Sequence, residues 1–352
     1  MHEELVSLLE KLSNAFAPPG YEDEVREIVR SELENVVDEI KIDALGNIIG
    51  IKHGNDAYPA ILLDAHMDEV GFIITHIEKK GFLRFHPLGG FDPKVLYAQK
   101  VVIKGDKGFV YGYIGAKAPH LQKPGEQSKA VEIENLFIDV GAASDEEVKE
   151  LGIDIGSVGT FATKFIRLND KRVMGKAFDD RAGLTALISI MKQLKDSEYN
   201  IIAIGAVQEE VGLRGARTAA WQVEADFALA LEGTAAADTP GTPDHRKSTE
   251  LGKGPAITIA DRSIIAHPKI VKALVEVANR RNIPYQFKRV IVGGTDAGVI
   301  HLTREGIPSG VVSVPCRYIH SPAAVLDLDD LKHMIDLVIG FIEYVSEEYK
   351  KQ

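Results

Sequence analysis

The stretch Asn200-Ile-Ile-Ala-Ile-Gly-Ala-Val-Gln-Glu-Glu210 decides the fold of this chain. Its apolar run is typical of a strand buried on both faces, and it ends in two adjacent acids, Glu209 and Glu210. Desolvation and mutual repulsion would raise the pKa values of two such carboxylates unless a cation compensated them. The stretch therefore predicts an α/β core with a cation bound at the end of this strand.

Other residues that could bind a metal stand in similar places. His66 closes the run Ile61–Ala65, with Asp68 two residues further on. The remaining candidates are Asp179 and Asp180 before a helical pattern, Glu232 after the run Phe227–Leu231, and His320 after the run that starts at Val311. Since ligands in open α/β sheets collect outside the carboxyl ends of the strands, we expect these side chains to converge.

The ligand types indicate the class of metal. Two imidazoles with several carboxylates and no thiolate favour Zn²⁺, Co²⁺, Mn²⁺ or Fe²⁺ over a cysteine-rich structural zinc or an all-oxygen calcium site. Two ions that share one bridging carboxylate would use this many acids and would position a water between them. Each residue alone is more often structural, since single histidines are usually ordinary and adjacent acids often cap helices. Their joint occurrence favours the metal site.

Composition excludes several other classes of function. The 352 residues are 45% hydrophobic, enough for a substantial core and roughly two domains. A net charge of -11 without a Lys/Arg block argues against a nucleic-acid partner. The single cysteine, Cys316, permits no internal disulfide, which fits a reducing compartment. No secretory leader or membrane-length apolar run is evident, so we expect a soluble, cytoplasmic protein with no membrane partner.

Helical and strand patterns alternate on both sides of a region with a different texture. Between Val70 and Ile166 the sequence has short β-rich pieces interrupted by glycine, which indicates a small barrel or sandwich inserted into an α/β domain. We expect a catalytic domain over 1–69 and 167–352, an insert over 70–166, and a mobile loop over 117–131. After two N-terminal helices, the expected strands are 47–52, 60–65, 201–207, 227–231, 285–290 and 311–314, and the expected helices are 181–194, 213–221, 269–281 and 328–349.

Six motifs together resemble a known family. They are Ala65-His-Met-Asp-Glu-Val-Gly71, Ala177-Phe-Asp-Asp-Arg-Ala-Gly183, Val207-Gln-Glu-Glu-Val-Gly-Leu-Arg-Gly215, Leu231-Glu-Gly233, Gly293-Gly-Thr-Asp-Ala-Gly298 and Tyr318-Ile-His-Ser-Pro322. This ordered set covers almost the whole chain and closely resembles the tetrahedral (TET) aminopeptidases, or glutamyl aminopeptidases, among the co-catalytic metallopeptidases. The resemblance implies a mixed-sheet α/β/α exopeptidase domain with an inserted, PDZ-like β-barrel for dimerisation.

The resemblance also implies a role for each candidate. Two divalent ions per subunit, Zn²⁺ or Co²⁺, would be held by Asp180 as the bridging carboxylate, by His66 and Glu232 on one ion, and by Glu210 and His320 on the other. Glu209 would be the general base, and Asp68 would orient His66. Asp179 competes with Asp180 for the bridge, and motif position favours Asp180. The chain departs from the family at Glu232, where a shorter aspartate is common, so the geometry and metal preference of that ion stay open.

The implied activity is release of N-terminal residues from short peptides. Glu209 would take a proton from a metal-activated water and pass it to the leaving amine. A dipeptidase or carboxypeptidase of the same clan is the nearest alternative. A glycoside hydrolase with paired carboxylates is a weaker one, because it would not need His66 and His320. The resemblance further implies a hollow dodecamer built from dimers, with the insert driving assembly, while the motifs leave the preferred N-terminal side chain open.

Overall fold

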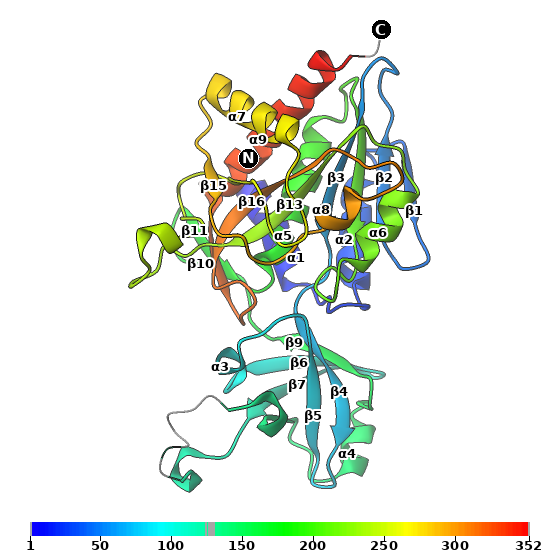
Figure 1. The fold of residues 1–352 in the computed structure, drawn as a ribbon. Coiled ribbons are helices and arrows are strands. Elements are labelled where there is room, and N and C mark those ends of the chain that lie inside the picture. Colours follow the sequence, from blue (N-terminus) through cyan, green and yellow to red (C-terminus); the bar gives the residue numbers. More distant parts are fainter. Residues whose placement is uncertain (1, 124, 126–130, 351–352) are drawn as a thin grey trace.

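The computed structural model of the chain describes residues 2–123, 125 and 131–350. In them an eleven-stranded mixed sheet carries helices on both faces, and a closed six-stranded barrel lies below it (Figure 1). The sheet order is β1-β2-β12-β3-β13-β16-β17-β11-β10, with β14 paired to β16 and β15 to β14. The strands of the sheet are β1 (Glu39–Ile42), β2 (Ile48–Lys52), β3 (Ala60–His66), β10 (Ile166–Arg167), β11 (Arg172–Gly175), β12 (Asn200–Ala206), β13 (Phe227–Ala235), β14 (Ala256–Thr258), β15 (Gln286–Lys288), β16 (Ser309–Arg317) and β17 (Ala324–Asp327).

Four parallel strands form the centre of the sheet. β12 pairs in parallel with β3, β3 with β13, and β13 with β16. Along β3, Ile61 and Leu63 join the core on one face while Leu62 joins the core on the other, because side chains alternate across a strand. Burial on both faces explains the continuous apolar runs in the sequence.

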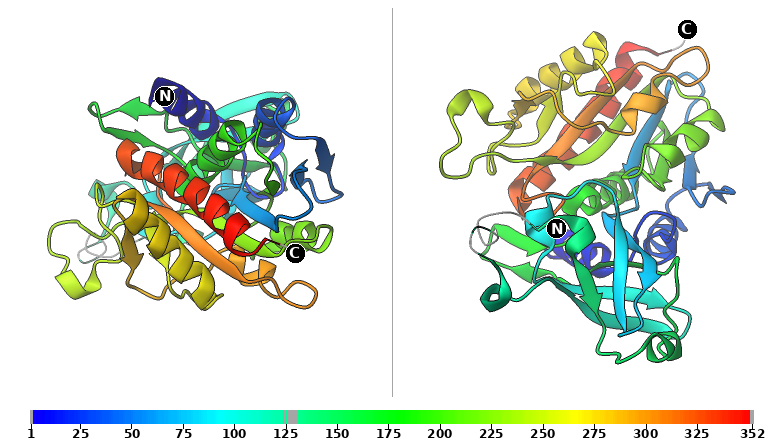
Figure 2. Two further views of the ribbon diagram at one scale, coloured as in Figure 1. Left: turned by 90° about the horizontal axis from the view of Figure 1, so that it is seen from above. Right: turned by 60° about the horizontal axis from the view of Figure 1, so that its bottom comes forward.

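The helices divide unequally between the two faces. The larger core packs the first face against α1 (His2–Asn14), α2 (Asp23–Leu33), α5 (Phe178–Gln193), α7 (Pro268–Arg281) and α9 (Leu328–Glu348). The second face is covered by α6 (Arg214–Trp221) and α8 (Ala297–Ile300). Seen from above, α7 and α9 lie side by side across the sheet (Figure 2). The predicted α/β/α arrangement is confirmed.

The predicted β-rich insertion is present as the closed barrel. Its order is β4-β5-β8-β7-β6-β9. The elements in this part are β4 (Gly71–Ile77), β5 (Phe82–Leu88), α3 (Pro93–Leu96), β6 (Lys100–Gly105), β7 (Gly108–Gly115), β8 (Phe137–Asp139), α4 (Asp145–Glu150) and β9 (Val158–Phe161), with 3-10 turns at Pro119–Leu121 and Ile133–Asn135. It has a core of its own, in which Phe72, Leu83, Val101 and Ile138 are buried. The right-hand view of Figure 2 brings the barrel forward.

Several element boundaries differ from those predicted. The strand expected over 285–290 is only Gln286–Lys288, whereas β13 and β16 run beyond the ends of their apolar runs. β1, β10, β11, β14 and β17 were not predicted, because strands of two to four residues carry too little periodicity. Of the predicted loop 117–131, residues 124 and 126–130 lie outside the described residues.

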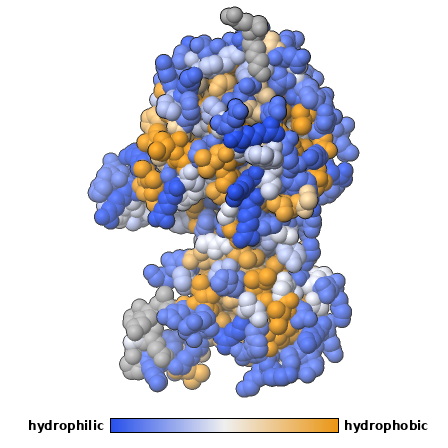
Figure 3. Space-filling model, turned by 45° about the vertical axis from the view of Figure 1, so that its right-hand side comes forward, coloured by the Kyte–Doolittle hydropathy of each residue, from blue (hydrophilic) through white to orange (hydrophobic). Residues whose placement is uncertain are grey.

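The surface carries apolar patches on both parts of the molecule (Figure 3). Trp221 and Leu302 are exposed on the sheet-and-helix part, and Tyr111 is exposed on the barrel. Among the described residues no helix is both long and apolar enough to cross a membrane.

Candidate metal centre

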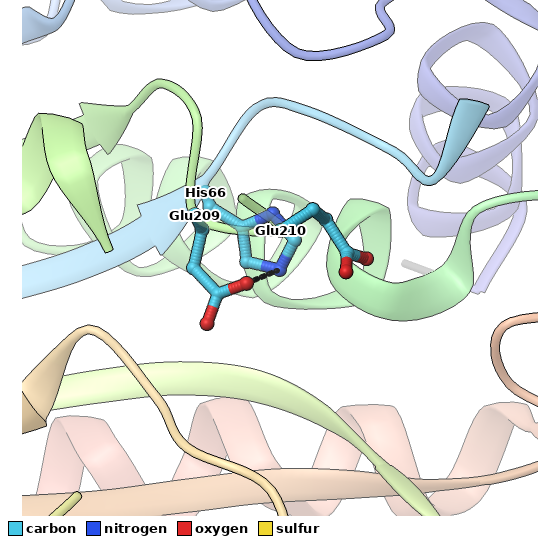
Figure 4. A group of neighbouring side chains, drawn as sticks. All are labelled: His66, Glu209 and Glu210. Atoms are coloured by element: carbon cyan, nitrogen blue, oxygen red, sulfur yellow. Dashed lines mark ion pairs between the residues drawn. The ribbon is translucent and has the colours of Figure 1, made fainter. Parts of the chain in front are cut away.

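Four of the predicted ligands and the predicted base Glu209 lie at or near the carboxyl ends of the four parallel central strands, while Asp180 lies in the first turn of α5. His66 is the last residue of β3, Glu232 lies in β13, and Glu209 and Glu210 form the turn after β12. His320 follows β16 by three residues. Figure 4 shows the imidazole of His66 between the side chains of Glu209 and Glu210. The strand ends therefore bring together side chains that are up to 254 positions apart, from His66 to His320.

Asp179 lies between the two imidazoles. Its Oδ1 is 3.3 Å from Nε2 of His66, and its Oδ2 is 3.4 Å from Nε2 of His320. Around this carboxylate, Glu232 Oε2 lies 3.9 Å from His66 Nε2, and Glu210 Oε2 lies 3.6 Å from His320 Nε2. Each oxygen of Asp179 thus faces one His/Glu pair, which is the arrangement expected of a bridging carboxylate.

Asp180 points elsewhere, in contrast to the expectation that it is the bridge. Its Oδ1 accepts a hydrogen bond from the backbone N–H of Gly183 at 2.9 Å, and its Oδ2 accepts one from the backbone N–H of His66 at 3.3 Å. The backbone leaves helical geometry at both aspartates, after Ala177 in the left-handed region at φ 58°, and the peptide between them is cis. The two carboxylates point in different directions, as their contacts show: Asp180 accepts backbone hydrogen bonds at the first turn of α5, and Asp179 enters the cluster.

Asp68 fixes the turn that carries the two glutamates. Its carboxylate accepts hydrogen bonds from the backbone N–H groups of Glu209, at 2.9 Å, and Glu210, at 3.0 Å. Its Oδ1 also lies 3.4 Å from Nδ1 of His66, the contact expected of a residue that orients this imidazole. Gln208 enters the turn with φ 56°, in the left-handed region that residues other than glycine rarely adopt. The contact to the turn was not predicted.

The cluster holds more carboxylates than cations. Burial raises the pKa of Glu210 to about 7, although His320 opposes the shift. Burial also raises the pKa values of Glu209 and Glu232 well above the ordinary glutamate range. For His320 burial lowers the pKa, but the charges of Glu210 and Asp179 outweigh it and raise the pKa to about 10. Such shifts are the signature of a buried acidic site that lacks positive charge.

The donor set fits divalent ions of the zinc and cobalt type. Three groups of ligand atoms each lie within 4.8 Å of one another: His66 with Asp179 and Glu232, Asp179 with Glu210 and His320, and His66 with Glu209 and Glu210. Oε1 of Glu232 is buried and has no hydrogen-bond partner among the described residues. A buried oxygen with no partner is costly, and a cation would satisfy it. Imidazole and carboxylate without thiolate match the preferences of these metals.

A cavity of about 380 Å³ opens beside the cluster. Asp179, Glu209, Glu210 and His320 lie in its wall, together with Gly90. The carbonyl oxygen of Gly90 lies 2.9 Å from Nδ1 of His320. Gly90 follows β5, so the inserted segment supplies a contact to this histidine although it contains none of the predicted ligands.

A buried ionic network supports the cluster and was not predicted. The guanidinium of Arg181 donates to the carbonyl oxygens of Met67 and, at 3.1 Å, Asp68. It also lies 3.3 Å from Glu69, whose carboxylate accepts hydrogen bonds from Lys176 at 2.5 and 2.8 Å. Arg181 therefore joins the segment after His66 to the start of α5. The position of Arg181 directly after Asp179 and Asp180 could have suggested a role at the site, but the sequence alone did not show which groups its guanidinium contacts.

Comparisons with known proteins show what this chain resembles. Residues 46–337 match the family model described as M42 glutamyl aminopeptidase. The lysyl aminopeptidase of Pyrococcus furiosus is 37% identical over 96% of both chains. Among solved structures, a TET aminopeptidase from Thaumarchaeota archaeon SCGC AB-539-E09 has a TM-score of 0.95 at 41% identity, covering 99% of each chain. The TET1 peptidase of Pyrococcus horikoshii, whose structure is described as a tetrahedron or a large octahedral shell, has a TM-score of 0.86 at 35% identity over 96% of this chain and 98% of that one.

Proposed function

The chain belongs to the M42 glutamyl aminopeptidase family, and from that premise we propose that it removes N-terminal residues from short peptides with two divalent cations. Family membership makes the protein an aminopeptidase, a peptide hydrolase of a metal-dependent family. The observation that carries the two-ion proposal is the position of Asp179, with one carboxylate oxygen toward each imidazole.

We assign the ligands in two sets that share one residue. His66 and Glu232 would hold one cation, Glu210 and His320 would hold the other, and Asp179 would bridge them. Asp180 is left out because its oxygens already accept backbone hydrogen bonds from His66 and Gly183. Zn²⁺ and Co²⁺ suit this set, and the longer side chain of Glu232 still brings Oε2 within 3.9 Å of His66.

Glu209 is the general base in this proposal. When bound, the cations would polarise the scissile carbonyl and lower the pKa of a water molecule. Glu209 lies in the cavity wall, with Oε2 3.9 Å from His66 Nε2, where its carboxylate can accept the proton of the attacking water. It then donates that proton to the leaving amine. Asp68 keeps Glu209 in place through the backbone, so the side chain itself stays free for proton transfer.

The proposed metal centre in the cavity wall supports an exopeptidase that binds a free amine. Asp179, Glu209, Glu210 and Glu232 would balance the charge of two divalent cations, and the lone pair of a peptide's α-amine could then bind to one of these cations. A glycoside hydrolase would place two carboxyl groups across a sugar and has no use for imidazoles 3.3 and 3.4 Å from one carboxylate. We therefore prefer a metal-dependent peptidase to a glycoside hydrolase.

A matched pair of peptides tests this function. A short peptide with a free N-terminus should be cleaved from that end, and the same peptide with an acetylated N-terminus should not, because the cap removes the charge and the lone pair. A metal chelator should abolish cleavage of the first peptide, and added Zn²⁺ or Co²⁺ should restore it. Efficient cleavage of the acetylated peptide would favour a carboxypeptidase, and chelator-resistant activity would remove the metal from the mechanism.

We also propose that the chain assembles into a closed shell of twelve subunits built from dimers. Support comes from the P. horikoshii relative named above and from large apolar side chains exposed on both parts of the chain, such as Leu302 at 71% and Tyr111 at 66%. Residues 1–69 and 167–352 would form the catalytic domain, and 70–166 the domain that drives dimerisation. Light scattering should give a mass near twelve chains, and a fully active monomer would contradict the proposal.

A further inference from the structure

The wall of the cavity contains one lysine that the proposed chemistry does not use. Lys288 lies in β15, lines the cavity and is only 7% exposed. The other charged side chains of the wall are the acids and the histidine of the metal centre. No described residue forms a hydrogen bond or ion pair with the ammonium group of Lys288. A largely buried cation without a partner is costly, so a role in binding an anion is the natural explanation.

Strand pairing explains how Lys288 reaches this cavity. Glu232 in β13 lies beside Ser313 in β16, and Ser313 lies beside Ala256 in β14. Thr258, two residues after Ala256 and therefore on the same face, lies beside Lys288 in β15. One face of the sheet thus leads from a proposed metal ligand across three strand spacings, roughly 14 Å, to Lys288. The cavity lies over this face, since Glu232, Ser313 and Lys288 all line it.

The proposed metal centre and Lys288 both line the cavity. At the centre, with Glu209, Glu210 and Glu232, a bound cation would take the α-amine of a peptide through its lone pair. A substrate held there by its amine would direct its first side chain along the cavity toward Lys288. Ser313, beside Glu232, and Val292 also line the cavity. Among the described residues of the wall, Lys288 is the one cationic group outside the proposed metal centre.

We propose that Lys288 is a specificity-determining residue that binds the side-chain carboxylate of an N-terminal glutamate or aspartate. This inference rests on the proposed aminopeptidase function and adds its substrate class. Family membership alone does not decide the point, because the family description names glutamyl activity while the P. furiosus relative is named a lysyl aminopeptidase. An ammonium group at this position favours an acidic side chain and repels a basic one.

Kinetics on isosteric substrates provide the first test. Glutamyl and glutaminyl p-nitroanilide differ in charge and hardly in shape, so the ratio of their kcat/KM values isolates the charge. We expect the wild type to prefer glutamyl by at least about tenfold and to cleave lysyl p-nitroanilide poorly. Lys288→Met should lower kcat/KM for the glutamyl substrate roughly ten- to a hundredfold and leave the leucyl substrate within about twofold. Lys288→Arg should keep most of the preference.

Lys253 offers a matched control, since it is an exposed lysine outside the cavity wall. Lys253→Met should leave the glutamyl to glutaminyl ratio unchanged. A wild-type ratio near one, or a ratio that survives in Lys288→Met, would overturn the assignment. If Lys288→Met does not fold by thermal melting, Lys288→Gln provides the same test with a polar side chain in place of the cation.

Product binding separates this inference from the proposed function. Calorimetric titration of the full chain with L-glutamate and L-glutamine needs no turnover. The wild type should bind glutamate at least about tenfold more tightly, and Lys288→Met should bind the two equally. This result would support Lys288 even if no peptide were cleaved, an outcome that would count against the aminopeptidase proposal alone. Equal binding of both amino acids by the wild type would overturn the role of Lys288.

Discussion

Replacing Glu209 with glutamine should abolish most activity without removing the metals. The amide keeps the shape of the side chain but cannot take a proton from water. The turn should survive, because Asp68 holds it through the backbone N–H groups of Glu209 and Glu210 rather than through the Glu209 side chain.

The structure indicates the size of the loss. Removal of a general base typically costs 10²- to 10⁴-fold. The side chain of Glu209 is only 11% exposed, so solvent has little access to act as a substitute base. We therefore expect the upper half of that range, about 10³- to 10⁴-fold in kcat, which corresponds to about 4–5.5 kcal/mol.

The assay combines steady-state kinetics with metal analysis of the same preparation. Glu209→Gln should retain the metal content of the wild type, and Glu305→Gln, at an exposed position, should match the wild type in both measurements. A variant that retains more than a tenth of the wild-type kcat would refute the role of Glu209 as base. Loss of metal would make Glu209 a ligand instead, which its place near His66 and Glu210 would then explain.

Three further substitutions test the turn at the site, a buried ion pair and a buried carboxyl group. Asp68→Asn loses one of the two carboxylate oxygens that accept hydrogen bonds from the turn. Metal affinity, measured in competition with a chromophoric chelator, should therefore fall roughly ten- to a hundredfold. Unchanged affinity would contradict the positioning role of Asp68. Lys176→Met breaks a buried ion pair with Glu69 and should lower the free energy of unfolding by about 3 kcal/mol in urea, whereas Lys192→Met, at an exposed pair with Glu32, should cost less than about 1 kcal/mol. Burial raises the pKa of Asp330 from 3.8 to about 6, so the folded state binds its proton more tightly and stability from this group is lost as pH rises from about 4 to about 6. Asp330→Asn should flatten that part of the pH profile by up to about 3 kcal/mol, and an unchanged slope would exclude Asp330 as its source.

Much of the fold and the set of candidate ligands could be predicted because buried parallel strands leave a clear pattern. β3 and β12 are buried on both faces and mostly apolar, and the first polar residues after such runs lie at one edge of the sheet. His66, Glu209 and Glu210 were found in this way. Short strands such as β14 and β17 were not predicted because three or four residues show no period.

The choice between Asp179 and Asp180 could not be made from sequence. Both residues carry a carboxylate, and they are neighbours in the sequence. They differ in where the local backbone directs them, because the backbone departs from helical geometry at Asp179 and Asp180 within the first turn of α5. The spacing of apolar residues in the sequence gives no information about this departure from helical geometry. Lys288 was missed for a related reason, since a single lysine in a three-residue strand becomes notable only when strand pairing places it in the cavity wall.

Anomalous diffraction from crystals loaded with Zn²⁺ or Co²⁺ tests the central claim most directly. The account predicts two anomalous peaks per chain, one between Asp179, His66 and Glu232 and the other between Asp179, Glu210 and His320, with Asp180 bound to neither. A single peak, or two peaks bridged by Asp180, would contradict the two-ion site built on Asp179.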